Sequence, residues 1–305
     1  MTVIEVRGLT KRFGPVLAVD DVSFHADRGT VTGFLGPNGA GKTTTLRMLL
    51  GLIEPTGGTA TINGRAYRDL PGPVHQVGAV LEATSFHPGR TARDHLRVQA
   101  AAGQVGASRV SEVLELAGLA GAAHRRIGGF SLGIRQRLGL ATALLGDPGA
   151  LILDEPANGL DPDGVRWLRG LLRGLAAGGR TVLVSSHILA EVAQIADHVI
   201  ILDHGRLITQ ATLTELTARA GQVVRIRTPR AAQLHAALAA AGQRAHMAGP
   251  DRLEVTGCTP EQAGTLAAQL AIPIYECAAQ APSLEEVFFH LTAAPASQPP
   301  QEMPR

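Results

Sequence analysis

The sequence predicts an α/β fold in which helices cover a parallel β-sheet. Short apolar runs alternate with helical patterns up to about residue 215, and several of the runs lead directly into a helix. Such alternation is typical of buried parallel strands with helices on both faces of the sheet. The length of 305 residues and the hydrophobic content of 45% allow one large domain and one smaller domain.

The strands of this predicted sheet are apolar runs of four or five residues. They lie at residues 31–35, 77–81, 150–153, 181–184 and 199–202. Helical patterns follow three of them, at residues 42–52, 163–177 and 189–196. A mostly helical insert, at about 91–146, separates the second strand from the third. We expect these elements to form a first domain at residues 1–220.

The residues after 220 have a different rhythm. Strands are expected at 222–228, 244–247, 252–256 and 272–277, and helices at 231–241 and 260–270. The order β-α-β-β-α-β is the split pattern of a ferredoxin-like unit. With a capped amphipathic helix at 283–289, these elements predict a small α+β domain at 221–292. The tail at 293–305 is rich in Pro and Gln and is expected to be disordered.

Composition argues against several functions. The net charge is +2 and the basic residues are scattered, so nucleic acid is not an expected partner. No apolar run approaches the roughly 20 residues of a membrane-spanning helix, and the first residues lack a signal-peptide pattern. Cys258 and Cys277 lie far apart, which favours reduced thiols in a cytosolic protein. Any contact with a membrane is therefore expected to go through a partner.

A glycine-rich loop follows the strand at 31–35 and leads into a helix at Lys42. Its sequence fits the phosphate-loop (P-loop) pattern in the required strand–loop–helix context, whereas a glycine-rich turn that binds nothing would not need that context. Backbone N–H groups and the helix N-terminus bind phosphate oxygens in such loops, Lys42 reaches the β- and γ-phosphates, and Thr43 binds Mg²⁺. The expected ATP contacts are Gly36, Pro37, Asn38, Gly39, Ala40, Gly41, Lys42, Thr43 and Thr44.

Two adjacent carboxylates end the strand at 150–153. In a parallel sheet they lie beside the phosphate loop, so Asp154 is expected to hold Mg²⁺ and Glu155 to orient and deprotonate the attacking water. Alone, the pair would be better interpreted as an ordinary strand-end turn. His187 follows the next strand and is expected at the same edge of the sheet as a γ-phosphate sensor, although a lone His there is more often structural.

Further motifs narrow this class of protein. Residues 130–137, Phe-Ser-Leu-Gly-Ile-Arg-Gln-Arg, resemble the signature sequence of ABC transporters, and residues 158–162, Asn-Gly-Leu-Asp-Pro, resemble their D-loop. Phe13 is similar to the aromatic residue that stacks on adenine, and His187 matches the switch histidine. The chain is thus identified as resembling the ATP-binding subunit of an ABC transporter over residues 3 to about 220.

The resemblance implies a P-loop NTPase fold of the ABC type, with antiparallel N-terminal strands beside the parallel core. It also implies that two copies, or this chain and a paralogue, hold two ATP molecules and Mg²⁺ between them. Ser131, Gly133 and Asp161 would then contact the ATP bound by the opposite chain. An integral-membrane permease is the second implied partner. The chain would be cytoplasmic and peripheral on the inner face of the cell membrane.

Two positions depart from the common ABC pattern. Leu132 replaces the first signature glycine, and Glu82 stands where the Q-loop normally has Gln. Glu82 could still ligate Mg²⁺ or water. Residues 80–88 and 91–96 resemble the bacitracin-resistance-type drug and peptide export ATPases, in which an acidic residue at this place is usual. This resemblance implies an exporter of an antibiotic or other drug, with the permease docking near residues 82–90 and the helical insert.

Two alternatives remain open from the sequence. A soluble ABC ATPase of translation or DNA repair usually carries two nucleotide domains or a long coiled-coil insertion, and neither pattern is present. The C-terminal domain could be a regulatory or ligand-sensing module, or an addition that stabilises a dimer.

Overall fold

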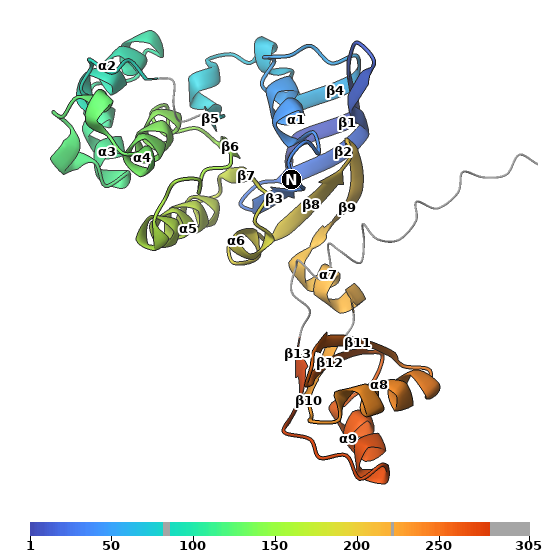
Figure 1. Cartoon of the computed structure of the whole chain (residues 1–305). Coiled ribbons are helices and arrows are strands. Elements are labelled where there is room, and N and C mark those ends of the chain that lie inside the picture. The colour runs from blue at the N-terminus through green and yellow to red at the C-terminus, as the bar shows by residue number, and fades with distance from the viewer. Residues whose placement is uncertain (82–85, 221–222, 281–305) are drawn as a thin grey trace, which may run out of the picture. The chain divides into compact units, whose positions relative to one another are not determined.

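The structure is a computed structural model that describes residues 1–81, 86–220 and 223–280. The chain divides into two compact units, Met1–Thr212 and Leu213–Arg305 (Figure 1). Glu82, the helix expected at 283–289 and the tail at 293–305 lie outside the described residues. The predicted boundaries at 220 and 292 stay a prediction.

The first unit is built around the predicted parallel sheet, which confirms the α/β fold class. Its strand order is β5-β6-β7-β3-β8-β9, and all neighbouring pairs are parallel except β8 with β9. β3, β6 and β7 are buried along their whole length, as expected for mostly apolar strands of a parallel sheet that is covered on both faces. The strands are β3 (Val31–Leu35), β5 (Val77–Val80), β6 (Ala150–Asp154), β7 (Thr181–Ser186), β8 (His198–Asp203) and β9 (Arg206–Thr212).

A separate antiparallel sheet contains the N-terminal strands. It has the order β2-β1-β4, with β1 (Thr2–Phe13), β2 (Val16–Asp27) and β4 (Gly57–Ile62). The side chains of β2 alternate between buried and exposed from Val22 onward, as expected for a sheet with one solvated face. The antiparallel N-terminal strands implied by the family resemblance are therefore present.

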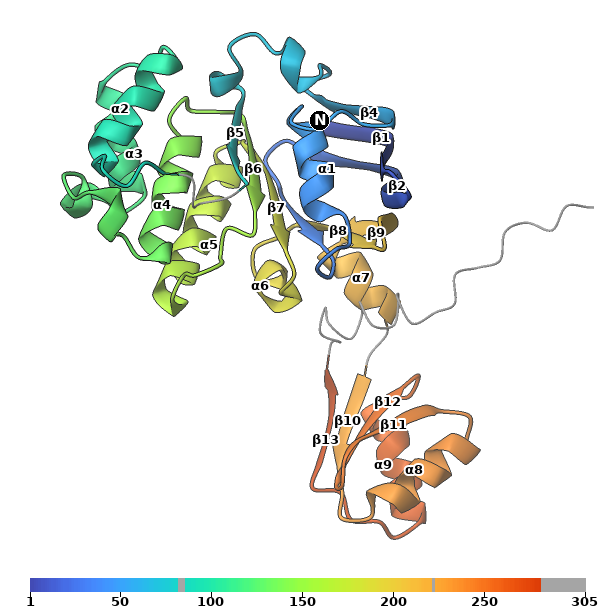
Figure 2. The same cartoon turned by 45° about the horizontal axis from the view of Figure 1, so that its top comes forward.

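Helices cover the parallel sheet and form the predicted insert. Figure 2 shows α2, α3 and α4 gathered beside one another, and α4 packs against the edge strand β5. Helix α1 ends before residue 52, because Gly51 adopts a φ of 66° that an α-helix does not continue through. The helices are α1 (Lys42–Leu49), α2 (Ala92–Ala102), α3 (Ser108–Leu116), α4 (Leu132–Ala143), α5 (Pro162–Ala177) and α6 (Leu189–Ala193). Short 3₁₀ helices lie at Tyr67–Asp69, Pro73–His75, Ala120–Ala122 and Ile127–Gly129.

The first unit has two hydrophobic cores, one on each face of the parallel sheet. One core joins the sheet to α2–α5, and the other joins it to α1 and the antiparallel sheet. Phe34 of β3 is fully buried in the second core, where its ring packs 5.2 Å from that of Phe24. Within the described residues, no helix is both long and apolar enough to span a bilayer.

The second unit is an α+β structure. It contains α7 (Leu213–Ala220), β10 (Val223–Arg227), α8 (Ala231–Ala240), β11 (Arg244–Gly249), β12 (Arg252–Thr256), α9 (Pro260–Gln269) and β13 (Glu276–Gln280). From β10 to β13 the element order is β-α-β-β-α-β, and the antiparallel sheet order is β11-β12-β10-β13. Helices α8 and α9 pack on one face of this sheet (Figure 2).

One strand of this unit differs from the prediction. The strand expected at 272–277 begins only at Glu276. Ala271 adopts a φ of 52°, and the N–H of Ile272 bonds back to the carbonyl of Ala267, so Ile272 closes helix α9 and enters the core. Pro273 then has no N–H to donate to a strand ladder.

Candidate ATP-binding site

The candidate site lies where three neighbouring parallel strands end. In the sheet β6 pairs with β7, and β7 pairs with β3. The register places Asp154 opposite Ser185, and Ser186 opposite Leu35, the residue before the phosphate loop. Because the carboxyl ends of parallel strands meet at one edge, the phosphate loop and the residues after β6 and β7 come together there.

The phosphate loop, residues 36–43, needs glycine at two positions. A Cβ on Gly36 would lie 2.4 Å from the carbonyl oxygen of Leu202, and a Cβ on Gly41 would lie 2.7 Å from that of Ala18. Both residues also have positive φ, 157° and 98°. Gly41 is the N-cap of α1, so the loop delivers its backbone directly to the positive end of that helix.

The side chain of Lys42 folds back onto the phosphate loop. Its ammonium group donates to the carbonyl oxygens of Gly36, at 2.7 Å, and Pro37, at 3.3 Å. The side chain is 7% exposed, and Nζ lies 3.6 Å from Oε1 of Glu155. The lysine is thus oriented by the loop backbone and faces Glu155, the residue directly after β6.

Thr43 and Asp154 lie in direct contact. The Thr43 hydroxyl donates to Oδ2 of Asp154 at 2.7 Å, and the buried Ser185 hydroxyl donates to Oδ1 of the same carboxylate. A hydroxyl and a carboxylate are the hard oxygen ligands that Mg²⁺ prefers. The pair therefore fits the magnesium site expected from the sequence, and Ser185 fixes the orientation of the carboxylate.

Glu155 has an unusual backbone conformation. Its φ is 49°, in the left-handed region that a non-glycine residue rarely occupies and that is often found at functional sites. Its N–H donates to the Ser185 hydroxyl at 3.0 Å, and its Oε2 lies 2.9 Å from Nδ1 of His187. The turn thereby aims the carboxylate toward Lys42 and His187 instead of into the sheet.

Two residues of this cluster were not singled out by sequence reasoning. Ser185 connects Asp154 to the backbone of Glu155. Its only signal in the sequence was its place directly after the apolar run at 181–184, two residues before His187. Burial raises the pKa of Glu191, with the charge of Glu155 adding to the shift and those of His187 and Arg169 opposing it. Glu191 lies on the short helix α6, whose periodicity marks no particular side chain as part of a site.

The signature segment, residues 130–137, forms the start of α4. Ser131 is exposed and is the N-cap of that helix, where its hydroxyl accepts from the N–H of Ile134 at 3.4 Å. Asp161 is likewise the N-cap of α5 and accepts from the N–H of Gly164 at 2.7 Å. Both side chains therefore stand at helix N-termini, whose positive ends favour anions.

The signature segment and the D-loop, residues 158–162, pack on one another. A Cβ on Gly159 would lie 2.3 Å from Cδ2 of Leu132, and a Cβ on Gly133 would lie 3.0 Å from the carbonyl oxygen of Gly159. The leucine that departs from the ABC pattern thus covers Gly159, while remaining 48% exposed.

The predicted site residues form two groups. Residues 36–44 adjoin Asp154, Glu155 and His187, whereas Ser131, Gly133 and Asp161 form the second group. Among the described residues, no hydrogen bond or ion pair joins Ser131 or Asp161 to the phosphate loop. Phe13 stands at the end of β1, 47% exposed, with Nζ of Lys11 5.0 Å from the ring centroid.

This fold and site define a phosphate-loop nucleotide-binding protein. The family described as "ABC transporter" matches residues 19–158, and a "Domain of unknown function (DUF8746)" matches residues 222–285. The chain is 42% identical over 221 residues to the bacitracin transport ATP-binding protein BcrA of Bacillus licheniformis, covering 72% of each chain. It is 35% identical over 209 residues to the lantibiotic transport ATP-binding protein SrtF of Streptococcus pyogenes, covering 68% of this chain and 90% of that one.

Solved structures agree with these sequence relatives. An ATP-binding subunit of an ABC transporter, 30% identical, superposes with a TM-score of 0.66 over 71% of this chain and 92% of its own. A bacterial ABC transporter cassette solved as a dimer, 26% identical, has a TM-score of 0.63 over 69% and 98%. The chain belongs to the ATP-binding proteins of the ABC transporter family, which bind and hydrolyse ATP. The resemblance inferred from the motifs is thereby confirmed.

Proposed function

We propose that this chain is the ATP-hydrolysing motor subunit of an exporter and that it acts with a separate membrane permease. The observation that carries the proposal is the convergence of Lys42, Thr43, Asp154, Glu155 and His187 at one sheet edge. Several relatives named for bacitracin or lantibiotic transport support a peptide antibiotic as the cargo class. A non-transport ABC ATPase is the weaker candidate, because those relatives are named for transport.

In the proposed reaction, Glu155 is the base that takes a proton from the attacking water. Its carboxylate lies between the Lys42 ammonium, at 3.6 Å, and the His187 ring, at 2.9 Å. Both neighbours hold the carboxylate beside the place that the γ-phosphate would take when Lys42 binds it, with room for the attacking water between them. Thr43 and Asp154 would hold Mg²⁺, which supplies charge neutralisation on the phosphates when bound.

The group of Ser131, Gly133 and Asp161 is proposed to act across a dimer. Ser131 and Asp161 stand at helix N-termini, and within the described chain neither is bonded to the phosphate loop. A second subunit arranged head to tail would bring this group to the γ-phosphate that the first subunit binds. Loss of that phosphate removes contacts from both sides of the interface, so hydrolysis would open the dimer.

Dimerisation provides the first test of this proposal. The Glu155→Gln variant, which should bind ATP without turning it over, is expected to elute as a dimer with ATP and Mg²⁺ and as a monomer with ADP. Adding Ser131→Arg should abolish the dimer, because a bulky side chain then occupies the place of the phosphate contact. Arg135→Gln in the same helix is the control and should still dimerise. If Glu155→Gln elutes as a monomer with ATP and Mg²⁺ as well as with ADP, the proposed head-to-tail dimer is wrong.

Coupling to transport is tested separately, in membranes. A tagged full-length chain, solubilised with mild detergent, is expected to retain one integral-membrane protein in stoichiometric amount, identified by mass spectrometry. Reconstituted in vesicles, that protein should raise ATP turnover of the chain. Recovery of the chain without any membrane protein, together with unchanged turnover in vesicles, would favour the non-transport alternative.

A further inference from the structure

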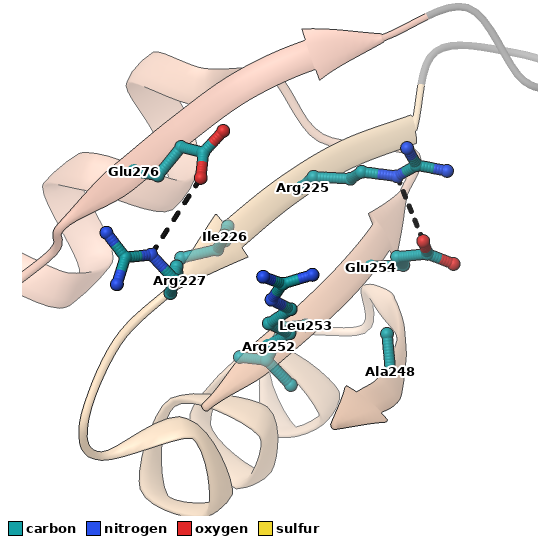
Figure 3. Close-up of a pocket in the computed structure, with 8 residues that line it drawn as sticks. All are labelled: Arg225, Ile226, Arg227, Ala248, Arg252, Leu253, Glu254 and Glu276. Carbon is teal, nitrogen blue, oxygen red and sulfur yellow. Dashed lines mark hydrogen bonds and ion pairs between the residues drawn. The ribbon is translucent and has the colours of Figure 1, made fainter. Parts of the chain in front are cut away.

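The second unit carries a cavity on the sheet face that α8 and α9 leave open. The cavity has a volume of about 410 Å³ and is lined by residues of β10, β11, β12 and β13. That volume lies in the range of sites for small molecules. Its lining residues all belong to the second unit, and they are Arg225, Ile226, Arg227, Ala248, Arg252, Leu253, Glu254 and Glu276 (Figure 3).

Strand alternation explains why charged groups line this cavity. Val224 and Ile226 of β10, with Leu253 and Val255 of β12, pack into the core under the helices. Because successive side chains of a strand point to opposite faces, the residues between them point away from the helices. The side chains on the open face include Arg225, Arg227, Arg252 and Glu254 (Figure 3).

The strand register places like charges directly opposite one another. Arg227 of β10 pairs with Arg252 of β12, whereas Arg225 pairs with Glu254. Directly opposed like charges destabilise an antiparallel sheet, so the Arg227–Arg252 pair is unfavourable unless an anion lies between the two side chains. Three arginines against two glutamates leave the lining with one positive charge in excess.

The two glutamates of the lining do not neutralise both Arg227 and Arg252. Glu254 accepts from Nε of Arg225 at 3.0 Å. Glu276 lies 3.9 Å from Nε of Arg227, at the limit of an ion pair, and is 61% exposed. Among the described residues, the side chain of Arg252 has neither an ion-pair nor a hydrogen-bond partner.

We propose that this cavity binds a small soluble anion through phosphate or carboxylate groups held between Arg227 and Arg252. The guanidinium group is planar and presents paired donors that match these anions in a bidentate manner. Arg225, whose side chain is held by its hydrogen bond to Glu254, lines another part of the cavity. On β11 the lining residue is Ala248, whose small side chain leaves space for the ligand. The site shares no residue with the phosphate loop, so its ligand is distinct from the ATP that is hydrolysed.

Binding is tested by calorimetric titration of the full-length chain with citrate and with inorganic phosphate. The background variant Lys42→Ala removes phosphate binding at the phosphate loop. We expect one saturable site for at least one of the two probes. Arg252→Gln should weaken its affinity by about tenfold or more, as for the loss of a charge-assisted hydrogen-bonded pair.

The matched control is Arg244→Gln. Arg244 lies on the neighbouring strand β11, opposite Thr256, and does not line the cavity. The variant should bind the probe as the background protein does. Equal losses in Arg244→Gln and Arg252→Gln would mean general charge attraction and would overturn the proposal, as would the absence of saturable binding of both probes.

Thermal unfolding separates a binding role of Arg252 from a structural one. Without added anion, Arg252→Gln should be at least as stable as the background protein, since it removes the cross-strand repulsion with Arg227. With the bound probe, the background protein should unfold at a higher temperature and Arg252→Gln should show little shift. A variant that is less stable without anion would assign Arg252 a structural role and contradict the proposal.

Discussion

Nδ1 of His187 lies 2.9 Å from Oε2 of Glu155, although the two residues follow different strands. The contact depends on the left-handed φ of Glu155, which turns its side chain toward the end of β7. One carboxylate oxygen is thereby held by the imidazole, while the other faces the Lys42 ammonium.

We expect His187→Ala to reduce ATP turnover by about 10²-fold, because the base loses the group that orients its carboxylate. ATP affinity should change little, since Lys42 and the loop backbone remain. His187→Asn, which can still donate a hydrogen bond, should recover part of the turnover. His246→Ala in β11 is the control and should be unaffected. Equal turnover in His187→Ala and the unmodified protein would remove the histidine from the site.

Ser185 is predicted to support both acids at once. Its hydroxyl donates to Asp154 and accepts from the N–H of Glu155, and the residue is fully buried. Ser185→Ala leaves buried polar groups without partners, so the free energy of unfolding should fall by about 1–3 kcal/mol in urea titrations. ATP turnover should fall as well. In Ser186→Ala, whose hydroxyl accepts from Ile188, turnover should fall much less.

Leu132 and Gly159 are predicted to be energetically coupled. Gly159→Ala should destabilise the chain by at least about 1 kcal/mol, because alanine resists the φ of 77° and its Cβ meets Leu132. Adding Leu132→Ala should recover part of this loss, since the steric contact is removed while the backbone strain remains. Urea unfolding of the two single variants and the double variant measures the coupling, expected to exceed about 0.5 kcal/mol. If the changes in free energy of unfolding of the two single variants simply add in the double variant, the D-loop moves to accommodate the new Cβ and the two residues are not coupled.

Glu191 should make stability depend on pH. Burial raises its pKa above the ordinary value of 4.5, so the folded state favours the protonated carboxyl. In the unmodified protein, the contribution of protonated Glu191 to the free energy of unfolding is fully present below pH 4.5. It is lost as the pH rises through the raised pKa of the folded state. The Gln side chain of Glu191→Gln does not titrate, so this variant does not lose stability in the same way as the pH rises. Its free energy of unfolding relative to the unmodified protein should therefore increase from acid toward neutral pH, and a constant difference would contradict the assignment.

The sequence could predict the parallel core because its strands are continuous apolar runs. β3 matches its predicted bounds, and the strands carrying Asp154 and Ser185 differ only at their ends. The edge strand β9 was missed, because its polar and apolar residues at 206–212 do not form a buried run. The start of the strand expected at 272–277 was wrong, because Ile272 and Pro273 are apolar residues that close a helix, and β13 begins only at Glu276.

The site residues could be predicted where the local backbone conformation imposes a recognisable sequence pattern. Residues 36–43 need glycine at two close approaches, and Asp154 and Glu155 stand at the end of a buried strand, so both segments stand out in the sequence. Ser185 does not stand out, since its role depends on the pairing of β6 with β7. The Arg227–Arg252 pair likewise requires the strand register, which residue patterns alone do not supply.

Single-turnover hydrolysis shows whether Glu155 is the base that takes a proton from the attacking water. Glu155→Gln preserves the size of the side chain and its place beside Lys42 and His187, but cannot accept a proton from water. We predict that ATP binding stays nearly intact while the hydrolysis rate falls by roughly 10²–10⁴-fold. If the Glu155→Gln variant hydrolyses bound ATP at nearly the unmodified rate, Glu155 is not the base.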